Sequence, residues 1–144
     1  VSIGGVPYTR KEKSFAEKIY KTLRNPSLSI SSAQEVQTYQ FTKGKGSTDV
    51  GDVSWMVPTA GLRTATWVPG TSAHTWQAVS AGGMSICMKG MVNAAKVIAG
   101  TAFDLYNDPE TIKNSKKELI ERRGPKFNYY SLLGERKPPL DYRK

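Results

Sequence analysis

The sequence has one cysteine, Cys87, and one histidine, His74, among 144 residues. A single cysteine excludes a disulfide within the chain and suits a reducing compartment, so we expect a cytoplasmic protein. The clustered cysteines and histidines of a structural zinc site are absent. No apolar run approaches the roughly 18 residues that a membrane helix needs, and the first residues lack a signal-peptide core. We therefore expect no membrane partner.

Sequence motifs for phosphate, dinucleotide or polyhistidine metal binding are also absent. One imidazole and two carboxylates occur between Gly46 and Trp76, which is too few for most metal or acid–base chemistry without further partners. The function is then either binding, or chemistry shared with something larger. The first residue is Val1 rather than methionine, which fits the expectation of an excised or processed segment.

The positive charge lies at the two ends of the sequence. The net charge is +9, and basic residues concentrate in residues 10–24 and 113–144. No nucleic-acid-binding motif accompanies this charge, so we expect no nucleic-acid partner. The charge instead indicates a solvated face, or a surface that meets acidic residues outside this chain. Hydrophobic residues make up 38% of the chain, enough for one domain, and we expect residues 1–144 to form a single partial catalytic domain.

Three helices are predicted. Thr9 and Glu12 form a capping box before an amphipathic run that Asn25-Pro26 ends. Apolar residues at helical spacing predict a second helix over 83–105, whose apolar stripe should pack on a sheet. A third helix should begin at Pro109 and end near Gly124, and residues 125–144 should form an extended tail.

Two segments, 35–42 and 53–68, favour strands. The second reads as two short extended runs broken by Pro58 and Gly61. With the helices, these strands predict an α/β fold in which helices pack on a small mixed sheet.

A turn flanked by glycines places Ser47, Thr48, Asp49 and Asp52 together. Such a turn can offer hydroxyls and backbone N–H groups to an anionic ligand. It can equally be an Asx or Ser/Thr turn that caps the next element. The spacing leaves both interpretations open.

His74 lies in a loop between a predicted strand and a predicted helix, where binding residues often occur. An isolated histidine can also be a structural hydrogen-bonding residue. Arg63 alternates along the preceding run, where its guanidinium could clamp a carboxylate or face solvent.

Three segments resemble a known family: GSTDVGDVSW, LRTATWVPGTSAHTWQAVS and KGMVNAAKVIA, at 46–55, 62–80 and 89–99. They are similar to the carboxyl-terminal part of the aminobenzoyl-glutamate utilization protein B group of metal-dependent amidohydrolases and metallopeptidases. The resemblance is best from Gly46 to Ile98. It implies the carboxyl-terminal lobe of a zinc-peptidase-like α/β sandwich catalytic domain.

The resemblance implies that the complete enzyme hydrolyses the amide bond of aminobenzoyl-glutamate or related N-acyl amino acids with a divalent metal pair, zinc or manganese. It assigns His74 as one metal ligand, and makes the 47–52 turn a candidate for shaping the substrate end of the cleft. Arg63, from its place on the preceding run, is a further candidate for binding the substrate. No position here matches the other ligands or the catalytic base. The implied partners are the missing amino-terminal part of the catalytic domain, a small-molecule amide substrate and, for the complete enzyme, further copies of itself.

The chain alone is therefore expected to be inactive and to hold no metal tightly. A different class stays open beside this one. The same fold would then serve a non-catalytic basic binding module or subunit that holds an acidic partner or ligand.

Overall fold

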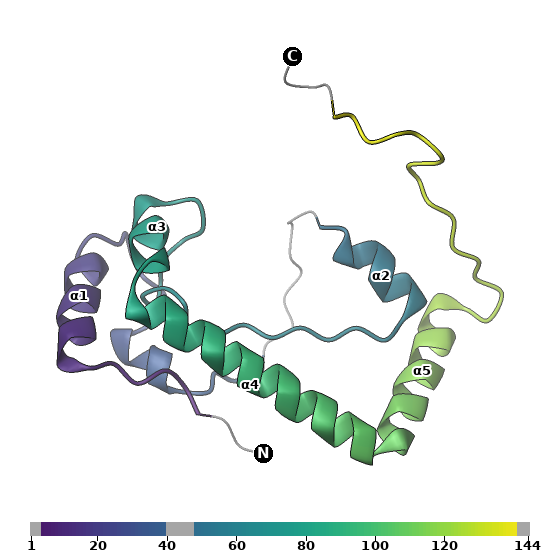
Figure 1. Ribbon diagram of the computed structural model, residues 1–144, viewed down its shortest axis with the longest axis horizontal. Coiled ribbons are helices and arrows are strands. Elements are labelled where there is room, and N and C mark those ends of the chain that lie inside the picture. The colour runs from purple at the N-terminus through teal and green to yellow at the C-terminus, as the bar shows by residue number, and fades with distance from the viewer. Residues whose placement is uncertain (1–3, 40–47, 141–144) are drawn as a thin grey trace. The chain divides into compact units, whose positions relative to one another are not determined.

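The computed structural model describes residues 4–39 and 48–140, and all of its regular elements are helices (Figure 1). The chain divides into two compact units. Unit 1 comprises residues 1–44 and 61–108, and unit 2 comprises residues 45–60 and 109–144. Each unit is therefore built from two separate stretches of the sequence.

The described residues of unit 1 form four helices: α1 (Arg10–Tyr20), the 3-10 helix η1 (Ile30–Gln34), α3 (Trp76–Gly82) and α4 (Ser85–Asn107). The predicted capping box of α1 is confirmed, since the N–H of Glu12 donates to the Thr9 hydroxyl and the N–H of Thr9 donates to the Glu12 carboxylate. The short helix α3 was not predicted. Its start is fixed by Thr75, whose hydroxyl accepts from the N–H of Ala78.

The core of unit 1 is small. Its fully buried apolar cluster consists of Ala16, Ile19, Val68 and Ile86, contributed by α1, the loop before α3, and α4. Four partly buried side chains pack against that cluster: Tyr8, Phe15, Tyr20 and Ile30. The cluster contains residues from both stretches of unit 1, and it fixes α1 against the first turn of α4.

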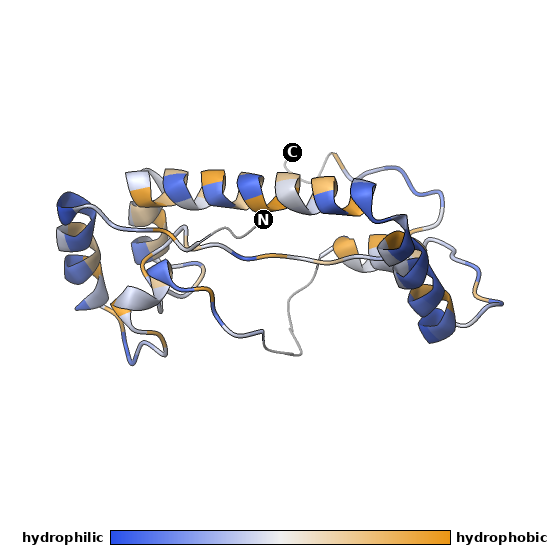
Figure 2. Cartoon of the chain, turned by 90° about the horizontal axis from the view of Figure 1, so that it is seen from below, coloured by the Kyte–Doolittle hydropathy of each residue, from blue (hydrophilic) through white to orange (hydrophobic). Residues whose placement is uncertain are grey.

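Helix α4 confirms the predicted second helix, displaced by two residues. Apolar residues recur along its whole length in Figure 2. Only Ile86 and Gly90 of its 23 residues are buried, and both lie in its first two turns. Within the described ranges, no helix is long and apolar enough to cross a membrane.

Unit 2 contains α2 (Val50–Met56) and α5 (Pro109–Arg123), followed by residues 124–140, which have turns but no regular element. Helix α5 confirms the third predicted helix, and Gly124 follows it in the left-handed conformation expected of a helix stop. Neither α2 nor α5 has a buried residue.

The predicted α/β fold is wrong for the part of the chain that the structure describes, because residues 4–39 and 48–140 contain no strand. The segment 53–68 was predicted as two strands. Its first four residues belong to helix α2, and residues 57–68 have no regular secondary structure. Residues 35–39 also lack it, and 40–42 lie outside the described residues. Among the described residues, the stripe of α4 consequently has no sheet to pack on.

Local chemistry accounts for this difference. A short apolar run does not by itself separate helix from strand, and Asp49 at the N-cap and Asp52 in the first turn favour a helix start at Val50. Segments with strand-like composition become strands only when another segment supplies the ladder of hydrogen bonds. In the segment 57–68 the hydrogen bonds are local or reach α4, where the Thr64 hydroxyl donates to the Gly90 carbonyl at 3.0 Å.

Candidate functional site

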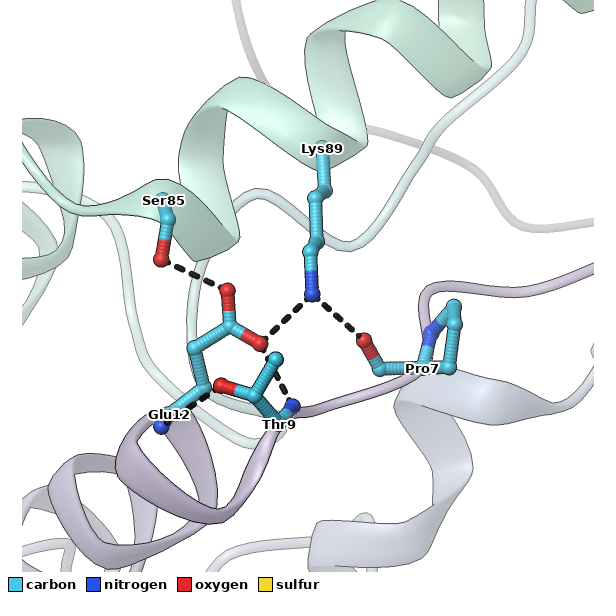
Figure 3. Close-up of polar contacts among 5 residues, drawn as sticks. All are labelled: Pro7, Thr9, Glu12, Ser85 and Lys89. Carbon is cyan, nitrogen blue, oxygen red and sulfur yellow. Dashed lines mark hydrogen bonds and ion pairs between the residues drawn. The ribbon is translucent and has the colours of Figure 1, made fainter.

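A buried charged cluster joins α1 to α4 in unit 1 (Figure 3). Glu12 is 4% exposed, and both of its carboxylate oxygens are used. Oε1 accepts from the Ser85 hydroxyl at 2.6 Å, and Oε2 accepts from the Lys89 ammonium at 2.6 Å and from the N–H of Thr9 at 2.6 Å. Lys89 also donates to the Pro7 carbonyl at 3.0 Å. We call these residues the Glu12 cluster.

The electrostatics of this cluster favour an ionised Glu12. Burial by itself raises the pKa of the carboxyl, but hydrogen bonds from Lys89, Ser85 and Thr9 outweigh it and lower the pKa from 4.5 to about 2. Burial, and then the Glu12 charge, raise the pKa of the neighbouring Tyr8 to about 12. A carboxylate held this firmly in its charged form is suited to fixing two helices and is a poor proton acceptor at neutral pH.

Helix α1 connects the Glu12 cluster to the loop that carries His74. Toward its other end, Ala16 and Ile19 pack with Val68, which begins that loop. Beyond the helix, the Thr22 hydroxyl accepts from the Gln77 amide at 3.2 Å. The loop therefore packs against α1, and the ion pair between Glu12 and Lys89 fixes the position of α1.

The loop 68–75 is held at both of its ends. A Cβ added at Gly70 would lie 2.6 Å from the Cβ of Pro26, so only glycine allows this approach, and its φ of +84° favours glycine as well. At the other end, the Thr75 hydroxyl donates to the Ser72 carbonyl at 2.8 Å while capping α3.

His74 is exposed in this loop and has a φ of +60°. Few residues other than glycine adopt this left-handed conformation, although histidine does so more readily than most. An exposed side chain gains no packing from such a backbone. Packing of the side chain therefore does not account for this conformation.

The other predicted site residues are exposed wherever they are described. Arg63 belongs to unit 1 with His74, whereas Thr48, Asp49 and Asp52 belong to unit 2, and Ser47 lies outside the described residues. The N–H of Val50 donates to the Thr48 hydroxyl at 3.4 Å, as expected for a Ser/Thr turn at the start of α2. This contact supports the Ser/Thr turn, while the N-cap residue Asp49 makes no capping hydrogen bond with its side chain, and the ligand-binding role of the turn stays a prediction.

Asp52 lines a shallow groove of unit 2 with aromatic residues that sequence reasoning did not single out. Trp55 stacks on Phe127 with ring centroids 5.0 Å apart, and the Arg123 guanidinium lies 5.5 Å from the Phe127 ring centre. Burial, the Asp52 charge and a hydrogen bond to Asp52 raise the pKa of Tyr129. The groove, about 170 Å³, is lined by Asp52, Trp55, Phe127, Asn128, Tyr129, Tyr130 and Leu132.

A metal pair was the predicted cofactor. No group of three or more His, Cys, Asp or Glu side chains within residues 4–39 and 48–140 could hold a metal ion. A catalytic zinc takes about three protein ligands, and the exposed imidazole of His74 can supply one. A metal at His74 would need its remaining ligands from outside the described residues.

Sequence reasoning identified Thr9 and Glu12 only as a helix cap. The partners Ser85 and Lys89 are 73 and 77 residues away from Glu12, so no local pattern reveals them. Lys89 stands alone among apolar residues at the start of α4, which is a signal that it needs a buried partner. That signal does not say which carboxylate it meets.

The described residues thus form a helical structure with an exposed loop histidine and no group of side chains that could hold a metal ion. The chain is similar to one subunit of the p-aminobenzoyl-glutamate hydrolase of Escherichia coli (strain K12), with 43% identity over 88 residues. This confirms the resemblance drawn from the sequence, and the match lies in a carboxyl-terminal part of the relative. The alignment covers 60% of this chain and spans 18% of the relative's length. No family model and no solved structure matches the chain.

Proposed function

We propose that this chain is the carboxyl-terminal part of a metal-dependent amidohydrolase that cleaves the amide bond of aminobenzoyl-glutamate or related N-acyl amino acids. The observation that carries the proposal is the 43% identity over 88 residues to a hydrolase subunit with that substrate in its name. Identity at this level over such a length supports shared chemistry in the whole protein. The chain by itself is inactive in this proposal.

His74 is the proposed contribution of this chain to a zinc or manganese pair. In such hydrolases the metals polarise the scissile carbonyl and lower the pKa of a bound water. The part played by this chain is to present one imidazole. Val68 in the core, Gly70 against Pro26, and the Thr75 cap hold the loop that presents it.

Arg63 and the turn at 47–52 are the proposed substrate-binding residues. Arg63 has an exposed guanidinium, which suits a bidentate pair with a carboxylate of a glutamate-containing substrate. Thr48, Asp49 and Asp52 are exposed polar groups that would shape the end of the cleft that receives the substrate. Each of these roles requires the rest of the protein.

The proposed partners are the remaining part of the catalytic domain and further copies of the complete enzyme. The relative is named as a subunit, which supports a function carried out in an assembly. A cytoplasmic location belongs to the same proposal.

A chimera tests the proposal. In it, this chain replaces the matching segment of the Escherichia coli relative, and the chimera is assembled with the rest of that hydrolase. We expect it to release glutamate from aminobenzoyl-glutamate, to lose activity with a chelator, and to regain activity when zinc or manganese is added.

The His74→Asn variant should lower this rate by about a thousandfold, as expected for loss of a group at the reacting centre. Asparagine tolerates the left-handed backbone, so the loop is preserved. Lys116→Asn, which places the same side chain at an exposed position of α5, should leave the rate within about twofold. Full activity of His74→Asn would remove His74 from the metal site, and an inactive, folded chimera would refute the proposed hydrolysis.

A further inference from the structure

Helix α4 has an unusual distribution of charge for a helix with so little buried surface. Only Lys89, Lys96 and Asp104 of its 23 residues are charged. At 100° per residue, Lys89, Asn93 and Lys96 fall on one side. The opposite side carries one apolar row spaced by three or four residues, and a second apolar row lies between that row and Lys96. We call these rows the α4 surface, and they contain Met91, Ala95, Ile98 and Ala102 in the first, with Val92, Ala99 and Phe103 in the second.

All seven side chains of the α4 surface are exposed. Three of its large side chains expose more than half of their area: Met91 exposes 57%, Ile98 59% and Phe103 65%. Within unit 1, the segment before Val68 approaches α4 at Gly90, where an added Cβ would lie 2.6 Å from the Ala65 carbonyl oxygen. That contact uses a different side of the helix and leaves the α4 surface uncovered.

An apolar surface of this extent is normally buried against protein. We propose that the α4 surface docks against apolar side chains of the remaining part of the hydrolase, which rests on the proposed function. The length of that remaining part supports this occupant, because the aligned segment spans only 18% of the relative. The chemistry of the rows supports it too. Small residues at Ala95, Ala99 and Ala102 allow another backbone to approach closely, as in the interior of a folded domain.

A pair of substitutions tests this docking in two settings. Ile98→Asp places a charge in the middle of the α4 surface, and Lys96→Asp places the same side chain on the polar side of the same helix. In the chimera we expect Ile98→Asp to lower the yield of folded protein at least about tenfold, since a charge in an apolar interface is costly. Lys96→Asp should stay within about twofold. In this chain alone, Ile98→Asp should leave the helix content unchanged and reduce binding of a hydrophobic dye.

Three results would overturn the docking. The first is a chimera that tolerates Ile98→Asp as well as Lys96→Asp. The second is loss of helix content in the isolated Ile98→Asp chain, which would mean that the chain itself covers this surface. The third is a stable dimer of the isolated chain that Ile98→Asp dissociates, which would make a second copy the occupant.

The docking and the proposed reaction can fail separately. A chimera that folds, depends on Ile98 and does not hydrolyse aminobenzoyl-glutamate supports the docking and refutes the activity. A chimera that hydrolyses the substrate and tolerates Ile98→Asp supports the activity and refutes the docking.

Discussion

Unit 1 and unit 2 are held together by different kinds of contact. Unit 1 has a buried apolar cluster and a buried ion pair, and both join residues far apart in sequence. The helices of unit 2 have no buried residue, and the contacts between its two stretches include the stack of Trp55 on Phe127 and the hydrogen bond from Arg123 to the Trp55 carbonyl.

This difference indicates where each unit obtains its stability. Stability comes chiefly from apolar surface removed from water, and unit 1 has an interior that supplies it. Unit 2 has an aromatic stack and helix-surface ion pairs such as Arg122 to Glu118, which contribute little each. We expect unit 1 to fold with its own core and unit 2 to open first.

Substitution of Lys89 should cause the largest loss of stability, and this loss should fall on unit 1. Lys89→Met leaves the carboxylate of Glu12 buried without its cation, which costs about 3–5 kcal/mol. Glu12→Gln should cost less, because the Lys89 side chain is 36% exposed and can be hydrated. Denaturant unfolding followed by circular dichroism would compare the two variants. Equal losses of unfolding free energy in the two variants would show that a buried, unpaired Glu12 carboxylate is not the main cost of Lys89→Met.

Acid should weaken unit 1 through the same carboxyl. The folded-state pKa of Glu12 is lowered from 4.5 to about 2, so its contribution is complete above pH 4.5 and is lost as the pH falls toward 2. The expected loss is about 3 kcal/mol. Glu12→Gln should flatten this part of the profile of unfolding free energy against pH. An unchanged slope between pH 5 and 2 would assign the acid sensitivity to other groups.

Loss of its aromatic stack should destabilise unit 2. Trp55→Ala removes the contact with Phe127, and a stacked pair contributes about 0.5–1.5 kcal/mol. Hydrogen exchange should accelerate in α5 while α1 keeps its protection. Exchange that rises equally in both helices would show that the two units unfold together.

The smallest effect concerns the backbone of His74. His74→Gly should stabilise the isolated chain by about 0.5 kcal/mol, because the relief of a left-handed conformation exceeds the extra entropy of glycine in the unfolded chain. His74→Val should destabilise it, since a β-branched residue is disfavoured at positive φ. Thermal unfolding would measure both, and identical midpoints would show that the loop adopts another backbone in solution.

The helices could be predicted where local signals agree. The capping box at Thr9, the Pro109 start and the Gly124 stop act within a few residues, so α1 and α5 followed from the sequence. The strands of 53–68 were predicted from composition, yet strand formation depends on a hydrogen-bonding partner. Within the described residues no segment takes that role, and Val53 to Met56 became helical instead.

For the candidate site, too, features set by neighbouring residues were predictable and features set by distant contacts were not. His74 was predicted to lie in a loop between a strand and a helix, and the structure has it exposed in a loop before α3, with no strand before it among the described residues. Its left-handed backbone was not predicted, since no local pattern around His74 specifies it. Its metal-binding role stays a prediction.

The sequence by itself determined the helix boundaries set by caps, the excess of positive charge and the resemblance to a hydrolase, because each depends on neighbouring residues or on residue identity. Only the tertiary structure decided that Glu12 meets Ser85 and Lys89, and that the apolar rows of α4 stay uncovered. Burial and ion pairing join residues distant in the chain. Such contacts depend on how the elements pack in space, which no local pattern specifies.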